Sequence, residues 1–131
     1  MRSLEIKRQK PVVETYHFDM RNPEQEAETK LNVGFAPLKP QENYPEENTI
    51  LGARLQFEVV FPEFIISGAI GQINHIANRK IAGPDDLSKV EADELVEPLF
   101  EMLQRLTYEV TEIVTDQPGI KLNFNNQEKE D

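Results

Sequence analysis

The chain has 131 residues, which suits one domain, and it has no cysteine, so disulfide frameworks and thiolate metal sites are excluded. Its formal net charge of -10 disfavours nucleic acid and anionic lipid as partners. The charge favours basic partners, including basic stretches of unfolded proteins, although acidic charge that only maintains solubility is an equally good interpretation.

Membrane insertion and export are not predicted. No apolar run approaches the roughly 20 residues that a membrane-spanning helix needs. The basic residues near the N-terminus are not followed by the apolar stretch of a signal peptide. The sequence therefore predicts a cytoplasmic protein.

The first part of the chain has the two-residue period that is typical of β-strands. Residues 4–8 alternate between apolar and polar side chains, Pro11 interrupts the pattern, and residues 12–13 and 16–18 resume an extended pattern. Residues 3–18 therefore predict one bent strand at a sheet edge. Residues 31–35 predict a second strand. Residues 37–48 contain several prolines among polar residues and predict a stiff loop.

The clearest strand pattern comes next. Residues 53–61 alternate, a Pro-Glu corner follows, and residues 64–73 are almost continuously apolar, as in a central strand. Gly68 and Gly71 within that strand favour a β-bulge. Their G-x-x-G spacing also occurs in clamps for phosphate or RNA backbone, but no basic residue lies within the motif.

A long helix is predicted after the sheet. Ser88 and Glu91 have the spacing of a capping box, and acidic residues crowd the first turns, where the helix dipole favours them. Apolar residues then recur every three or four positions from Leu95 to Ile113. Pro98 either starts the main helix or kinks it.

The chain is predicted to leave the helix at residues 117–119, Gln-Pro-Gly. A short extended piece follows at 120–124, and the acidic residues 125–131 are expected to be disordered. The fold class is therefore α+β, with one domain over residues 1–124.

The predicted helix has an apolar arc of roughly 160°, which is wider than packing on one sheet requires. We infer that one flank packs on the sheet and the other on a second copy of the chain. The candidates for this oligomer interface are Phe100, Met102 and Leu106. The alternative is a helix that exposes some of these side chains to solvent.

One helix cannot cover both faces of a sheet, so some apolar side chains should remain exposed. Val60 and Ile65 are predicted to point away from the main apolar rows, and Leu38 and Tyr44 lie in the proline-bearing loop. These four are our candidate peptide-binding residues, in a groove for extended segments. The alternative is that oligomerisation covers them.

Catalysis is poorly supported. The two histidines, His17 and His75, lie in or near predicted strands, and no serine lies in a nucleophile-elbow motif. The acidic residues between 85 and 94 lack the calcium-loop pattern and suit a helix N-terminus better. We expect no enzyme activity, no catalytic residues, no metal site and no cofactor.

Several stretches, taken in chain order, match one group of proteins. They are LEIKR at 4–8, ETKLNV at 28–33, LQFEVV at 55–60, PLF at 98–100 with Arg105, and PGIKLNF at 118–124. Together they resemble the SecB fold of the bacterial protein-export chaperone. More closely, they resemble an uncharacterised Gram-positive family of unknown function that is assigned to this fold.

The resemblance implies a four-stranded antiparallel Greek-key sheet followed by one long helix, and dimers that pair into tetramers. It also implies apolar grooves that hold unfolded client chains without nucleotide. The chaperone family continues into a second C-terminal helix that helps to wall the groove, and this sequence lacks that helix after Phe124.

Two functional hypotheses follow. The first is a SecB-like protein-binding module, an ATP-independent holdase for unfolded or exported polypeptides. The second is an oligomeric adaptor without chaperone activity. Both hypotheses expect protein partners, a homodimer or homotetramer, and no nucleic acid or membrane partner.

Overall fold

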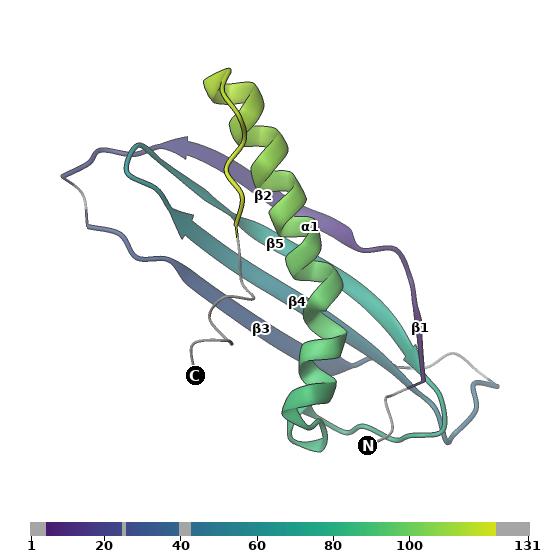
Figure 1. Ribbon diagram of the computed structural model, residues 1–131. Helices are drawn as coiled ribbons and strands as arrows, with labels where there is room; N and C mark the ends of the chain where they lie inside the picture. Colours follow the sequence, from purple (N-terminus) through teal and green to yellow (C-terminus); the bar gives the residue numbers. More distant parts are fainter. Residues whose placement is uncertain (1–4, 25, 40–42, 123–131) are drawn as a thin grey trace.

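The computed structural model describes residues 5–24, 26–39 and 43–122. An antiparallel sheet of five strands carries one long helix across one of its faces (Figure 1). The elements in chain order are β1 (Ile6–Arg8), β2 (Val12–Met20), β3 (Lys30–Pro37), β4 (Thr49–Val60), β5 (Phe64–Ile76), the short 3-10 helix η1 (Pro84–Asp86) and α1 (Lys89–Thr115). Within the described ranges, no helix combines the length and apolar character needed to cross a bilayer.

The sheet has the predicted α+β Greek-key arrangement. β3, β4 and β5 are consecutive neighbours, and both β1 and β2 pair with the other edge of β5. Counted as one bent strand, β1 and β2 return beside the last strand of the meander, as a Greek key requires.

The prediction of a single strand over residues 3–18 is wrong, because the structure has two strands there, β1 and β2. The predicted sheet therefore had four strands, whereas the observed sheet has five. The ladder breaks between β1 and β2, and Pro11 lies in the break. Proline has no backbone N–H to donate to β5, so the ladder cannot continue through it. The second piece extends farther than predicted, to Met20.

The core lies between the sheet and α1. Alternate residues of β4, from Leu51 to Val59, are buried beneath the helix, while the residues between them face the other way. Leu95, Leu99 and Leu103 of α1 are fully buried against this surface. Burial of such side chains contributes roughly 1.5–3 kcal/mol each, so this layer supplies most of the stability.

The predicted β-bulge is present, although the extra residue belongs to β2. The register between β2 and β5 shifts between Val13 and Thr15, which makes Glu14 the bulged residue. A Cβ atom on Gly68 would lie 2.1 Å from the carbonyl oxygen of Thr15. Glycine at position 68 therefore allows the bulged strand to approach β5.

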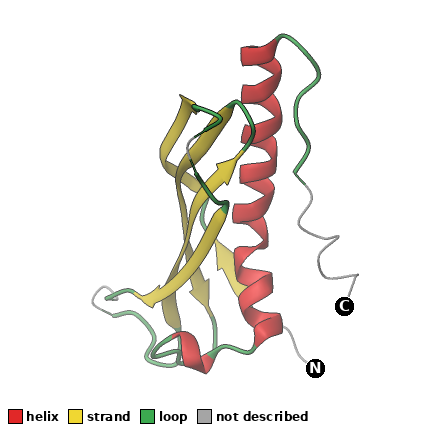
Figure 2. Ribbon diagram, turned by 90° about the vertical axis from the view of Figure 1, so that its left-hand side faces the viewer, coloured by secondary structure: helices red, strands yellow, loops and turns green. Residues whose placement is uncertain are grey.

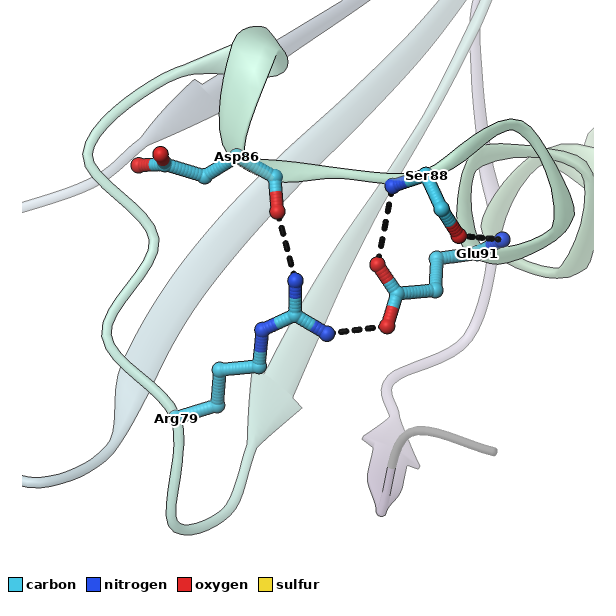
Figure 3. A network of polar contacts seen from close by, with 4 residues as sticks. All are labelled: Arg79, Asp86, Ser88 and Glu91. Atoms are coloured by element: carbon cyan, nitrogen blue, oxygen red, sulfur yellow. Dashed lines mark hydrogen bonds and ion pairs between the residues drawn. The ribbon is translucent and has the colours of Figure 1, made fainter. Parts of the chain in front are cut away.

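The capping box at the start of α1 is confirmed (Figure 3). The hydroxyl of Ser88 accepts a hydrogen bond from the backbone N–H of Glu91, and the carboxylate of Glu91 accepts one from the N–H of Ser88 at 2.9 Å. Arg79 donates to the same carboxylate and to the carbonyl of Asp86. This network joins the loop after β5 to the first turn of the helix.

Pro98 lies inside the continuous helix α1 and does not begin it. In a regular helix the N–H of residue 98 would bond to the carbonyl of Glu94, and proline cannot supply it. The guanidinium of Arg8, on β1, donates to that carbonyl at 2.7 Å. An edge strand thus replaces the missing helical hydrogen bond.

The chain reverses after α1 and runs back along it (Figure 1). Asp116 adopts the left-handed conformation at the helix end. The N–H of Ile120 donates to the Thr111 hydroxyl at 2.8 Å, and the Gln104 side chain donates to the carbonyl of Leu122 at 3.0 Å. The described part of the predicted extended piece, residues 120–122, is irregular, and the predicted disordered tail at 125–131 lies outside the described residues.

Candidate functional site

The second face of the sheet is open. Figure 2 shows α1 along one side of the strands, with the short η1 at their lower end and, among the described residues, no α-helix on the other side. The open face carries the even-numbered residues of β4 and the odd-numbered residues of β5, which pair with one another across the two strands. This face holds a concave surface that is lined by residues of β2, β3, β4 and β5.

A groove of about 520 Å3 crosses the open face. Its floor consists of two neighbouring cross-strand rows, Val12–Gly71–Arg54–Gly34 and Ile73–Gly52–Ala36. Most of these residues are glycine or alanine, so the surface is hollow where longer side chains would otherwise stand. A volume in this range is typical of binding sites.

Apolar side chains flank the hollow. Val12 is 59% exposed and Ile73 is 37% exposed, although both belong to the sheet. Gln9 and Gln56 also line the groove and offer amide groups. An exposed apolar surface with a few polar groups is typical of a site that binds another molecule.

An ion pair lies within the groove lining. Nε of Arg54 donates to a carboxylate oxygen of Glu14 at 2.9 Å, and the two side chains are 51% and 39% exposed. Glu14 reaches Arg54 across Gly71, where a Cβ atom would lie 2.5 Å from the other carboxylate oxygen. The bulge in β2 thus places Glu14 beside Arg54, and the missing side chain at Gly71 leaves room for its carboxylate.

One end of the open face is closed by a small polar network. His75 lies 3.3 Å from the hydroxyl of Tyr44 through Nδ1 and 3.1 Å from the amide of Gln9 through Nε2. The Gln72 side chain donates to the carbonyl of Gln9 at 2.7 Å. These contacts fix the break between β1 and β2 beside the groove.

The four candidate peptide-binding residues lie outside the groove lining. The side chain of Leu38 would be 3.7 Å from a Cβ atom on Gly52, and Tyr44 contacts His75, so both are near one end. Val60 and Ile65 pair with each other at the opposite end, next to the β4–β5 corner. The sequence thus placed its candidates near the two ends of the open face, outside its concave part.

The sequence does contain the small residues that form the groove floor, but it does not show that they lie together. Gly34 and Ala36 are at alternate positions of β3, and Gly52 is on β4. They form one hollow only because Ala36 pairs with Gly52, which is a fact of strand register.

The three candidate interface residues of α1 are half-buried. Phe100, Met102 and Leu106 pack against the chain's own core cluster, together with Ile120 and Leu122 from the returning segment. The more exposed apolar side chains of the helix lie near its two ends, Val90 at 64% in the first turn and Ile113 at 77% and Val114 at 51% in the last.

Neither histidine lines the groove. His17 is exposed on β2, and His75 lines a smaller pocket with Glu5 and Lys7. Among the described residues, no group of histidines and carboxylates has the spacing to hold a metal ion.

The sequence matches the model of a family described as proteins of unknown function, DUF1149, over residues 4–124. A solved structure of a protein of unknown function from Streptococcus agalactiae is 39% identical, with a TM-score of 0.85, and the match covers 94% of this chain and 100% of that one. No curated protein matches this sequence.

A more distant structure shares the fold. It is the SecB-like chaperone of Mycobacterium tuberculosis, solved in complex with a ChAD peptide from the HigA1 antitoxin. The identity is 8% and the TM-score 0.53, with 91% of this chain and 90% of that chain covered. The SecB-like fold predicted from the sequence is therefore confirmed.

Proposed function

The chain belongs to the DUF1149 family of unknown function and has a SecB-like fold, and we propose that it is a protein-binding module whose groove holds extended segments of other polypeptides. The observation that carries this proposal is the concave open face, with its floor of glycine and alanine and its exposed Val12 and Ile73.

The shape of the groove suits an extended chain. A segment in extended conformation places alternate side chains on one face, and large apolar side chains can enter the hollow above Gly34 and Gly52. The structure of the Mycobacterium tuberculosis chaperone, with a peptide bound to a protein of this fold, supports the same ligand class.

Binding of this kind needs no nucleotide. Burial of apolar surface drives association, and the groove is open to solvent, so clients can enter and leave without a powered step. We propose that the module acts as a holdase for unfolded or exported polypeptides.

An aggregation assay tests the holdase. A client unfolded in urea is diluted into buffer without ATP, and light scattering is followed with and without the protein. Suppression at a near-stoichiometric ratio supports the proposal. No suppression at a tenfold molar excess contradicts it.

Two matched variants locate the activity. Gly34→Gln fills the groove with a polar side chain, and no atom lies within 4 Å of a Cβ atom built there, so the fold should tolerate it. Asn32→Gln lengthens a side chain on the same strand and face but outside the groove lining. Suppression should fall several-fold in the first variant only.

The alternative function is an oligomeric adaptor without chaperone activity. It is favoured by the single α-helix of the described chain, which leaves the groove without a second helical wall. An adaptor would capture one defined partner from the native cytosol and would leave client aggregation unchanged.

We also propose that the protein forms a homodimer or homotetramer. Apolar side chains at the end of α1, including Ile113, remain exposed in one copy. A second copy is the simplest cover for them.

A further inference from the structure

We infer that the groove selects extended protein segments in which an acidic side chain lies close to large apolar ones, and that Arg54 and Lys10 bind the carboxylate. This inference rests on the proposed function, since it names the class of segment that the groove takes. The occupant is a polypeptide segment of another protein.

The local charge of the groove is opposite to that of the whole chain. The chain has a net charge of -10, yet the charged residues lining the groove are two cations, Lys10 and Arg54, and one carboxylate, Glu14. Positive charge therefore exceeds negative charge along the lining of this groove.

Arg54 keeps donors for a ligand. A guanidinium has five N–H donors, and Glu14 occupies the one on Nε. Among the described residues, neither terminal nitrogen of Arg54 has a hydrogen-bond partner. Two parallel N–H groups on one guanidinium match the two oxygens of a carboxylate.

Glu14 orients Arg54 without saturating it. The carboxylate is held over Gly71 by the bulge in β2, so the guanidinium is fixed in the row that also contains Val12. An arginine that is oriented before binding loses less side-chain entropy when a ligand arrives.

The apolar part of the ligand is set by the neighbouring positions. Val12 lies in the same cross-strand row as Arg54, and Ile73 lies in the next row. Side chains two positions apart in an extended segment point the same way, so the preferred pattern is acidic and apolar residues at alternate positions.

Labelled peptides test the inference. Three fluorescein-labelled peptides share the sequence Leu-Ser-Phe-Ser-X-Ser-Leu, where X is Asp, Asn or Lys, and binding is followed by fluorescence anisotropy at about 150 mM salt. At that salt the Debye length is about 8 Å, so contact with Arg54 outweighs the distant acidic surface. The Asp peptide should bind about fivefold more tightly than the Asn peptide, and the Lys peptide most weakly.

Variants of the protein assign the effect to the groove. Arg54→Gln and Lys10→Gln should each reduce the preference for Asp over Asn. Glu14→Gln should increase it, because the amide oxygen can still accept from Nε and orient the guanidinium, while the negative charge that opposes a bound carboxylate is removed. Arg105→Gln removes the same charge from an exposed position on α1 and should leave the preference unchanged.

The outcomes separate the two proposals. If all three peptides fail to bind, the proposed function is wrong. If they bind equally, or if Arg54→Gln leaves the Asp preference intact, the groove binds segments but the inference is wrong. A change in oligomer mass on Arg54→Gln would show that a second copy occupies the groove, which also overturns the inference.

Discussion

Gly68 and Glu91 occupy positions where contacts with their neighbours make one residue type more stabilising than others. Gly68 faces the carbonyl of Thr15 across the bulge, so any side chain there meets backbone. Glu91 combines an interaction with the Ser88 N–H and an ion pair with Arg79, and the hydrogen bond from Arg79 is the main cause that lowers its pKa. Both positions can be tested by single substitutions with matched controls.

Gly68→Ala should lower the free energy of unfolding by at least about 2 kcal/mol, because the added Cβ forces β2 away from β5. Gly34→Ala is the control, since its Cβ would meet no atom within 4 Å, and its effect should stay within about 0.5 kcal/mol. Urea denaturation followed by circular dichroism measures both. Equal losses in the two variants would contradict the close approach at Gly68.

Glu91→Gln should lower the free energy of unfolding by about 1 kcal/mol at pH 7, since the neutral amide keeps one cap contact but loses the charged pair with Arg79. The pKa of Glu91 is lowered by folding from its ordinary value of 4.5. Its charge therefore stabilises the fold above that value, and this contribution is lost as pH falls through the lower folded pKa.

The comparison of Glu91→Gln with the wild type should accordingly show a difference at pH 7 that shrinks as the pH is taken well below 4.5. Glu97→Gln, an exposed position farther along the same helix, should show no comparable difference at either pH. A difference for Glu91→Gln that does not change with pH would count against the ion pair.

The helix α1 is longer than the surface that supports it. Figure 2 shows its last turns extending past the ends of the strands, and Ile113 and Val114 are exposed there. By contrast, Phe100 and Leu106 pack on the chain's own core, so charged substitutions at those positions would damage the fold as well as any interface. The end of the helix is therefore the cleaner place to test self-association.

Ile113→Asp should reduce the oligomer mass measured by size-exclusion chromatography with light scattering, because a charge buried in the interface would have no partner. Gln117→Asp adds the same charge nearby without removing an apolar side chain, and it should leave the mass unchanged. A wild-type protein that is monomeric at tens of micromolar would contradict self-association through α1.

The molecule as a whole combines a strongly acidic charge with a groove lined by more cations than anions. The two act over different distances. The net charge acts on an approaching chain at long range, and salt screens it, whereas Arg54 acts on a bound carboxylate in contact. The first encounter can therefore favour basic stretches of a client, while binding in the groove favours an acidic segment of the same client.

A basic unfolded client should associate faster at low salt. The association rate measured by stopped-flow fluorescence should fall about tenfold between 10 and 300 mM salt, because attraction by the acidic surface is screened. The rate for an acidic client should rise over the same range. Rates that do not depend on salt for either client would show that the net charge has no part in capture.

The resemblance to a known family implied the SecB-like fold. Local patterns in the sequence determined the α+β class, the alternation of β4 and the capping box at Ser88. These features depend on residues close together in the chain, so periodicity and cap chemistry are enough to predict them. Tertiary structure alone decided the arrangement of Glu14 and Arg54 and the groove.

The groove exists because strand register brings Gly34, Gly52 and Gly71 together, and register depends on pairing between distant segments. The same holds for the carbonyl of Glu94, which Pro98 leaves without its helical hydrogen bond and which accepts one from Arg8, 86 residues away in the sequence. Residues that are far apart in the sequence and come into contact only after folding leave no periodic pattern from which the contact could be predicted.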